Sequence, residues 1–315
     1  MPDSGPEVIA TGINVVDFLA RPPADVVQGG KYETDELEVQ GGGPASTAAC
    51  VTAAFGHDTA FVARLGDDAI SRLSRSQFEQ AGILTDYLID APGERAGMSM
   101  VQIDRETGER TVFYNLRDYG WIRAEDIPGE AVAKAKLILV DGYDTTAALA
   151  ILRAAAGTPC RSIIDLEHGE SEFVNECISL ATDVVLPLHT ARAVTGKDAP
   201  EDTLHALAGL GTGQMVVTDG EHGSWALTPD GVIHQPAFAT EVIDTNGCGD
   251  AFHGAYAVGL LRGWPLALRM EFGAWVASRV ATALGGRSGI PDQADIERDL
   301  DRFSPALQAA VSELP

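Results

Sequence analysis

Short apolar runs alternate with helical stretches through the second half of the chain, and this alternation limits the fold more than any other feature. The runs AKLILVDG, RSIIDLE, DVVLP and GQMVVTDG lie between residues 135 and 220. Stretches of helical character, such as TAALAILRAAAG and DTLHALAGLG, separate them. Continuous apolar runs are typical of parallel strands that helices cover on both faces. The pattern therefore predicts right-handed βαβ units around a mostly parallel central sheet.

The first half of the chain begins in the same way. The segment EVIATGINVVDFLA, residues 7–20, is nearly continuous in apolar residues and predicts one first strand of that sheet. The segment GGGPASTAACVTAAFG, residues 41–56, predicts a loop followed by a helix of small residues that ends at Gly56.

Two segments break this order of strands and helices. Residues 25–40 and 97–117 have a period-2 alternation, and the second contains a turn at RETGE. They predict antiparallel strands outside the main sheet, forming a small β-lid from about 18–40 and 95–118; ordinary edge hairpins are the alternative. Since no Ser/Pro-rich linker divides the chain, we expect a single domain over residues 1–315.

Composition limits the partners of the protein. Of the 315 residues 45% are apolar, enough for a sizeable core, and the net charge of −24 argues against nucleic-acid or anionic-membrane partners. Four scattered cysteines without a CxxC pair predict reduced thiols. The first residues lack a basic, apolar leader pattern, and no apolar run reaches the ~20 residues of a membrane span. These features predict a cytoplasmic protein.

The segment IDTNGCGDAFHGAYAVGL, residues 243–260, places a glycine-rich turn and an acid before an apolar helix. Gly247 and Gly249 permit positive φ and close approach of a ligand. The turn therefore predicts an anion site at the helix N-terminus. Asp250 follows this turn, and a carboxylate beside an anion site is the expected base for a hydroxyl that attacks phosphorus. The alternative is that Asp250 only caps the helix.

Four segments together resemble one family. DTNGCGDAFHGA resembles the C-terminal signature DTxGAGDxF of the ribokinase-like (PfkB) carbohydrate kinases, and GGGPASTAACVTAAFGHDTAFVARLGDD resembles their N-terminal signature. VVTDGEHGSWAL resembles the nucleotide-side TxGxxG, and GGRSGIP also fits. The resemblance covers almost the whole chain, nearest the ketohexokinase and sulfofructose kinase side. It implies an α/β fold, a three-layer α/β/α sandwich with a β-lid, and ATP-dependent phosphorylation of a sugar.

The resemblance also implies roles for single residues. Asp250 would be the catalytic base, and the N–H groups of Gly247, Cys248 and Gly249 would hold the migrating γ-phosphoryl group. The implied sugar-binding residues are Asn14, Asp17, Gly41, Gly42, Ser46 (where many members have Asn) and, more weakly, Asp141. The implied nucleotide-side residues are Thr218, Gly220 and Gly223. A monovalent cation such as K⁺ would lie by Asp244 and the backbone near Ala283, Gly285 and Gly289.

One departure concerns the metal. Leu188 and Ala191 stand where many members have the Asn and Glu of an NxxE motif tied to Mg²⁺. Mg²⁺ would then be held mainly by the ATP phosphates and water, and Glu167 is the nearest acid to test. The seven histidines show no zinc-ligand spacing.

The substrate is less constrained. We expect the substrate to be a fructose-like ketose. The alternatives are a kinase that acts on a sulfosugar, ribose or a nucleoside, and a non-catalytic regulator that binds a sugar or a nucleotide. An acidic group on the sugar would need Arg or Lys in the pocket. The lid offers Arg95, Arg105, Arg110, Arg117 and Lys31.

The expected lid also predicts the oligomeric state. Its apolar residues Val26, Val27, Val101 and Phe113 would be exposed in a monomer. Exposed strand edges are usually covered or paired, so we expect a homodimer through the lid.

Overall fold

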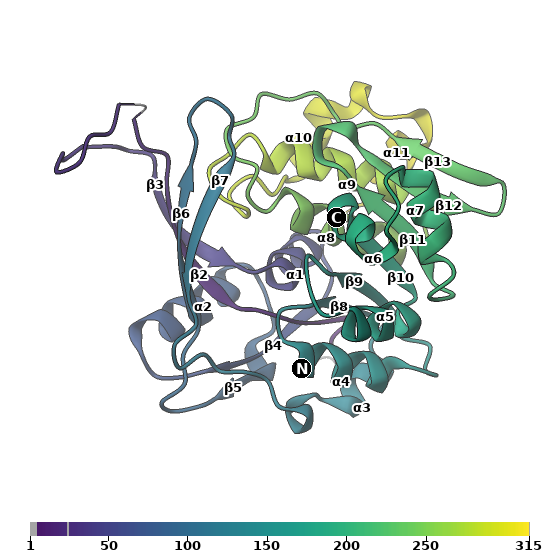
Figure 1. Cartoon of the computed structure of the whole chain (residues 1–315), viewed down its shortest axis with the longest axis horizontal. Helices are drawn as coiled ribbons and strands as arrows, with labels where there is room; N and C mark the ends of the chain where they lie inside the picture. The colour runs from purple at the N-terminus through teal and green to yellow at the C-terminus, as the bar shows by residue number, and fades with distance from the viewer. Residues whose placement is uncertain (1–4, 24, 315) are drawn as a thin grey trace.

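A nine-stranded central sheet forms the middle layer of the computed structural model, which describes residues 5–23 and 25–314 (Figure 1). The strand order is β13-β12-β11-β10-β9-β8-β1-β4-β5. The strands are β1 (Val8–Thr11), β4 (Thr59–Leu65), β5 (Leu88–Asp90), β8 (Leu137–Asp141), β9 (Arg161–Asp165), β10 (Asp183–Pro187), β11 (Gln214–Thr218), β12 (Ser224–Thr228) and β13 (Gly231–Gln235). All neighbours pair in parallel except β11·β12 and β12·β13.

Helices cover both faces of this sheet. One face carries α3 (Gly129–Lys134), α4 (Thr145–Ala155), α5 (Ser171–Leu180), α6 (Leu188–Thr195) and α7 (Pro200–Leu207). The other carries α1 (Pro44–Ala54), α2 (Ala69–Gln80), α8 (Cys248–Leu261) and α9 (Leu266–Val280). Because successive strand residues point to opposite faces, Ile9 joins the first core and Val8 and Ala10 join the second. The predicted α/β/α sandwich is confirmed.

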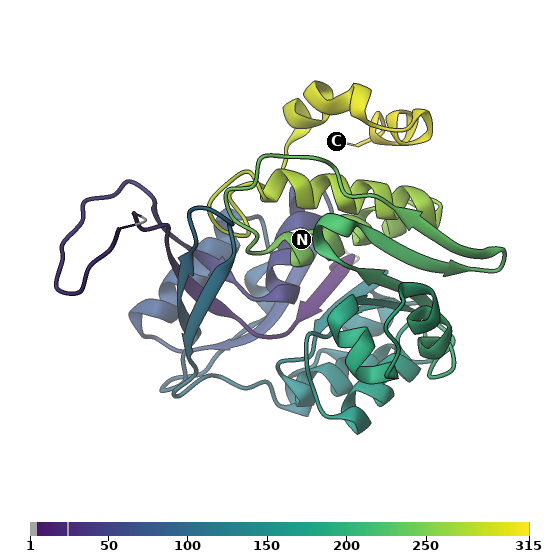
Figure 2. The ribbon, with the colours of Figure 1, turned by 45° about the horizontal axis from the view of Figure 1, so that its top comes forward.

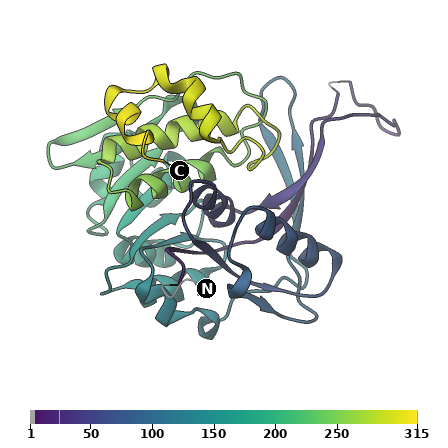
Figure 3. The same ribbon diagram turned by 180° about the vertical axis from the view of Figure 1, so that it is seen from behind.

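The chain after β13 strengthens the second helical layer. Helices α10 (Gln293–Asp299) and α11 (Pro305–Val311) place Ile296 and Leu307 against Trp275 of α9. Figure 3 shows these C-terminal helices, in yellow, covering the layer from behind. Among the described residues, no helix has the length and apolar character to cross a membrane.

The lid is a separate four-stranded sheet with the order β3-β2-β6-β7. Its strands are β2 (Val15–Ala20), β3 (Leu37–Gly42), β6 (Gly97–Ile103) and β7 (Arg110–Asn115). The predicted turn at RETGE does join β6 to β7. The lid is not wholly antiparallel, however, because β2 and β6 pair in parallel.

The prediction of one strand over residues 7–20 is wrong. Strand β1 belongs to the central sheet and β2 to the lid, with Gly12–Asn14 between them. The reason is a long-range contact, since a Cβ atom on Gly12 would overlap the Asp141 carboxylate. That carboxylate accepts the Ile13 N–H at 3.1 and 3.2 Å and so fixes the turn.

The prediction of strands over residues 25–40 is correct only at its end. Residues 37–42 form β3, whereas residues 25–36 have no strand and project away from the body (Figures 1 and 2). Val26 and Val27 are 53% and 63% exposed. No strand among the described residues pairs with residues 25–36. A strand needs such a partner to satisfy the hydrogen bonds of its backbone N–H and C=O groups.

Candidate active site

The carboxyl ends of the parallel strands converge on the N-terminus of α8. The register pairs Asp141 with Asp165 and Pro187 with Thr218, so β8 to β11 end along one edge. In parallel α/β sheets this edge is where ligands bind. Thr218, the first of the predicted nucleotide-side residues, ends β11 at this edge.

Gly247 makes the turn that opens α8. Its φ is +74°, and a Cβ atom there would overlap the backbone of Gly286. Only glycine fits both requirements. The N–H groups of a first helical turn lack intrahelical partners; here the Cys248 N–H makes only a marginal 3.4 Å contact with the Thr245 carbonyl. The turn therefore has the geometry of an anion site.

Asp250 follows in the first turn of α8, beside other acids. Burial, followed by the nearby Asp165 and Glu167 carboxylates, raises the pKa of Asp250 to about 7, while Arg110 and His253 oppose the shift. Burial raises the pKa of the Cys248 thiol to about 12, so that residue offers only its backbone. A carboxyl group poised near neutral pH beside an anion site suits proton transfer.

A second cluster lies at the junction of the lid and α1. The Asp17 carboxylate accepts the Ser99 hydroxyl and lies where a Cβ atom on Gly42 would be. Burial raises the pKa of Asp17, with Ser99 and Arg287 opposing. The Ser46 hydroxyl donates to the Gly42 carbonyl at 3.0 Å. Asp17, Gly42 and Ser46 thus lie close together at this junction.

Arg287 joins this cluster from the loop after α9. Its guanidinium donates to Ser46 and fills the space beside Gly41, while its backbone N–H donates to Gln40 Oε1 at 2.8 Å. The sequence segment GGRSGIP contains Arg287, but nothing in its spacing indicates a contact with residues 40–46. Within the described part of the chain Arg287 forms no ion pair.

Asn14 and Asp141 have protein partners of their own. The Asn14 amide exchanges hydrogen bonds with Ser74 Oγ at 2.9 and 3.0 Å and is 1% exposed. Asp141 is fully buried and accepts the N–H groups of Ile13, Ala45 and Tyr143. Asp141 therefore holds the two loops that carry the site.

The nucleotide-side residues form a tight loop at the end of β11. Gly220 and Gly223 have φ of +51° and +90°, and a Cβ atom on Gly223 would overlap the Gln235 carbonyl. The Asp219 N–H donates to the Gly223 carbonyl at 2.8 Å. Thr218 ends β11, so the loop starts at the carboxyl-end edge of the sheet, beside the end of β10.

Asp244 connects two parts of the site. Its carboxylate accepts the Asn246 N–H and the Gly285 N–H, each at 2.8 Å, and it is fully buried. These bonds hold the loop of Gly285 and Gly286 against Gly247.

The two positions of the missing NxxE motif carry apolar side chains. Leu188 and Ala191 are buried in the core, and Glu167 accepts the Tyr143 hydroxyl at 2.8 Å. Among the described residues no group of three or more His, Cys, Asp or Glu has the arrangement to hold a metal ion.

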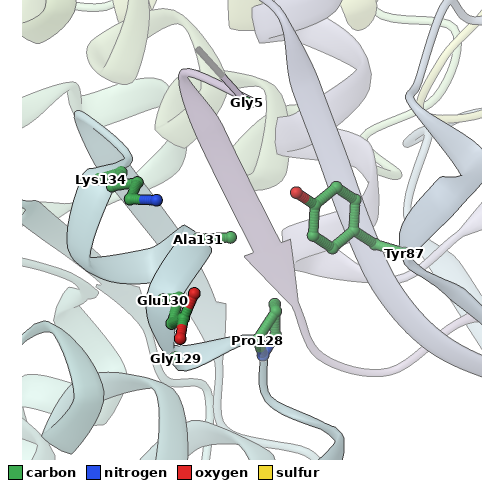
Figure 4. A pocket seen from close by; sticks show the side chains of 7 residues that line it. All are labelled: Gly5, Tyr87, Pro128, Gly129, Glu130, Ala131 and Lys134. Carbon is green, nitrogen blue, oxygen red and sulfur yellow. The ribbon is translucent and has the colours of Figure 1, made fainter. Parts of the chain in front are cut away.

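A hollow elsewhere on the surface has no comparable chemistry. It lies near the start of β1 and beside α3 (Figure 4). Its lining residues are Gly5, Tyr87, Pro128, Gly129, Glu130, Ala131 and Lys134. We assign this hollow no role.

Known proteins share these features. Residues 6–293 match the sequence model of the pfkB family of carbohydrate kinases. A fructokinase of Klebsiella pneumoniae is 28% identical over 84% of this chain and 92% of its own. The crystal structure of a ribokinase-like protein from Agrobacterium tumefaciens has a TM-score of 0.85 and 26% identity, covering 95% of this chain and 98% of its own. The Arabidopsis thaliana ribokinase complexed with ribose and ATP has a TM-score of 0.78 and 22% identity, covering 95% and 100%.

Proposed function

Because this chain belongs to the pfkB family of carbohydrate kinases, we propose that it transfers the γ-phosphoryl group of ATP to a hydroxyl of a small sugar, with Asp250 as the general base. The observation that carries this proposal is the position of Asp250. It lies in the first turn of α8, beside the turn at Gly247, with its pKa raised to about 7 by burial and neighbouring acids.

The geometry supports a simple sequence of events. The sugar binds beneath the lid against Asp17 and the backbone of Gly41 and Gly42, and its reacting hydroxyl points to Asp250. Asp250 takes the hydroxyl proton as the sugar oxygen bonds to the γ-phosphorus, and the bond between that phosphorus and the bridging oxygen breaks to release ADP. The N–H groups of Gly247, Cys248 and Gly249 stabilise the charge on the phosphoryl oxygens.

Nucleotide and cations complete the proposal. The loop at Thr218, Gly220 and Gly223 borders ATP. Mg²⁺ would be held by the ATP phosphates and water, and it would neutralise charge on the phosphates. A monovalent cation would be held by Asp244 and the backbone near Ala283, Gly285 and Gly289. Closure of the lid excludes water, which otherwise competes for the phosphoryl group.

A coupled assay of ADP release over a panel of sugars tests the proposal. A fructose-like ketose is the first expected substrate, with ribose and a nucleoside as comparison arms. Sugar-dependent ADP release supports the kinase. ATP binding without turnover on any sugar would instead indicate a non-catalytic regulator.

A second candidate substrate, a sugar with an acidic group, is favoured by Arg287. This half-buried cation lies against Ser46 and Gly42 without a carboxylate partner among the described residues. Arg110 of β7 supplies further positive charge, which opposes the rise in the pKa of both Asp17 and Asp250. Guanidinium groups bind carboxylate, sulfonate and phosphate well.

Replacing Arg287 with glutamine separates the two substrates. If the sugar is acidic, kcat/KM for it should fall on the order of tenfold to a hundredfold, the size of a lost charged hydrogen bond, while a neutral ketose changes little. Arg105→Gln is the matched control, because Arg105 forms an ion pair with Glu36 in the lid. Equal losses on acidic and neutral sugars would show that Arg287 only holds the loop.

We also propose that the lid forms a homodimer. An apolar row crosses its outer face through Leu37, Val39, Phe18, Met100 and Phe113, which are 37–60% exposed. Val101, which the sequence suggested as exposed, is instead 1% exposed and packs with Leu19 and Ile103. Two copies of this row would cover each other about a two-fold axis.

Light scattering at micromolar concentration tests the dimer. We expect twice the monomer mass for the native chain and the monomer mass for Phe113→Glu, since a buried charge without a partner opposes association. Tyr114→Glu, on the opposite face of the same strand, should stay dimeric. A monomer mass for the native protein contradicts the proposal.

A further inference from the structure

His253 is a buried histidine whose ring nitrogens both face hydrogen-bond acceptors. It lies on α8 one turn after Asp250 and is 2% exposed. Nδ1 lies 2.8 Å from the Gly249 carbonyl oxygen and 3.3 Å from Asp165 Oδ2. Nε2 lies 2.8 Å from the Val185 carbonyl oxygen in β10.

These partners restrict the protonation state of the ring. A neutral imidazole has one N–H donor and one nitrogen lone pair, and a backbone carbonyl can only accept. In either neutral tautomer a lone pair would therefore face a carbonyl oxygen at 2.8 Å. The imidazolium form, with two N–H donors, satisfies both carbonyls, and Asp165 supplies the counter-charge.

The surrounding charges favour the same state. Burial alone would lower the pKa of His253, but Asp165 and the Val185 and Gly249 carbonyls outweigh it, and Asp250 adds to them, so the pKa is raised. Asp165 faces the ring from β9, with its own pKa raised by burial to about 6. Glu167 lies beyond Asp165, and Arg110 approaches Asp250 from the lid.

We propose that His253 is a permanent imidazolium beneath the anion-binding turn, and that it acts as a positioning residue which fixes the Gly249 carbonyl and favours the ionised form of Asp250. The second half rests on the proposed function, in which Asp250 is the base. His253 does not touch substrate. Its fixed charge opposes the carboxylates of Asp165 and Glu167, which favour the protonated form of Asp250.

The protonation state is tested on the wild-type protein by two-bond ¹H–¹⁵N correlation of the imidazole rings between pH 6 and 9. We expect both nitrogens of His253 to remain protonated across this range. His57 is the internal comparison, because burial lowers its pKa; His253→Gln and His57→Gln assign the signals. An unprotonated His253 nitrogen at pH 7 overturns the proposal, whatever the variants do.

The effect on Asp250 is tested by the pH dependence of kcat. In His253→Gln the acidic limb should move to higher pH, with activity below the limb falling about tenfold for each unit of displacement and recovering at high pH. His205→Gln, an exposed residue of α7, should match wild type. A loss by the same factor at every pH overturns the charge role and leaves only a packing role.

The two proposals fail in different ways. If Asp250→Asn keeps wild-type turnover, the base assignment is wrong, yet the resonance measurement still decides the charge of His253. If the acidic limb of the kcat profile does not move in His253→Gln while Asp250→Asn is inactive, the kinase mechanism stands and the positioning role of His253 is refuted.

Discussion

Replacing Asp250 with asparagine is expected to lower kcat by about 10²–10⁴-fold, the usual contribution of a general base. Asparagine keeps the shape of the side chain in the first turn of α8 but cannot take the hydroxyl proton. ATP affinity should change little, because the N–H groups of the turn remain. Asp230→Asn, in the exposed turn between β12 and β13, is the control and should be unaffected. Turnover within a few-fold of wild type would refute the assignment.

The pH dependence of the wild-type enzyme follows from the same group. With the Asp250 pKa raised to about 7, the base is protonated below that pH, so kcat should rise as pH increases through about 7 and level off above it. Asp250→Asn should abolish this limb. A flat wild-type profile between pH 5.5 and 8 would mean that Asp250 does not limit turnover.

Stability should respond with the opposite sign. Between the ordinary pKa of an unfolded aspartate and about 7, the folded protein binds more protons at Asp250 than the unfolded chain, so this residue makes the free energy of unfolding fall as pH rises through that window. Asparagine does not ionise, so the variant does not lose this stability as pH rises. We therefore expect the Tm of Asp250→Asn at pH 8 to equal or exceed that of wild type.

Replacing Gly247 with alanine is expected to reduce both kcat and stability strongly. The residue has φ of +74°, and the added Cβ atom would overlap the Cα of Gly286, so the turn must move and its N–H groups lose their aim. Loss of one aligned donor to a developing oxyanion typically costs about 10²–10³-fold in kcat. Phosphate analogues should bind more weakly for the same reason.

Gly263→Ala is the matched control for this change. Gly263 lies just beyond the other end of α8, with φ of +71° and nothing within 4 Å of an added Cβ atom. It carries the backbone strain of a positive φ without the collision, so we expect a modest fall in Tm and normal kcat. If the two variants have equal kcat, the close packing of Gly247 on Gly286 has no role in catalysis.

Local pattern was sufficient to predict the layers of the fold. Continuous apolar strands such as Leu137–Val140 indicate burial on both faces, because each face receives every second side chain. The turn at Gly247 and the acid at Asp250 were also readable, since positive φ, an exposed first helical turn and a following carboxylate are properties of neighbouring residues.

Strand membership needed the tertiary structure. Residues 7–20 are uniformly apolar, yet β1 joins the central sheet and β2 the lid. The division is made by Asp141, 128 residues away, whose carboxylate holds the Ile13 N–H. No local period encodes such a contact. Residues 25–36 show the opposite case. Their polar and apolar residues alternate as in a strand, but no strand among the described residues pairs with them.

The electrostatics of the site were likewise decided by the fold. Arg287 reaches Ser46 across 241 residues of sequence, and His253 meets Asp165 only where α8 lies against the end of β9. By itself His253 is one of seven histidines without a motif. The sequence determined which groups carry the chemistry, because backbone freedom and side-chain type are local properties. Only the tertiary structure decided which charges surround them, because that depends on contacts between distant parts of the chain.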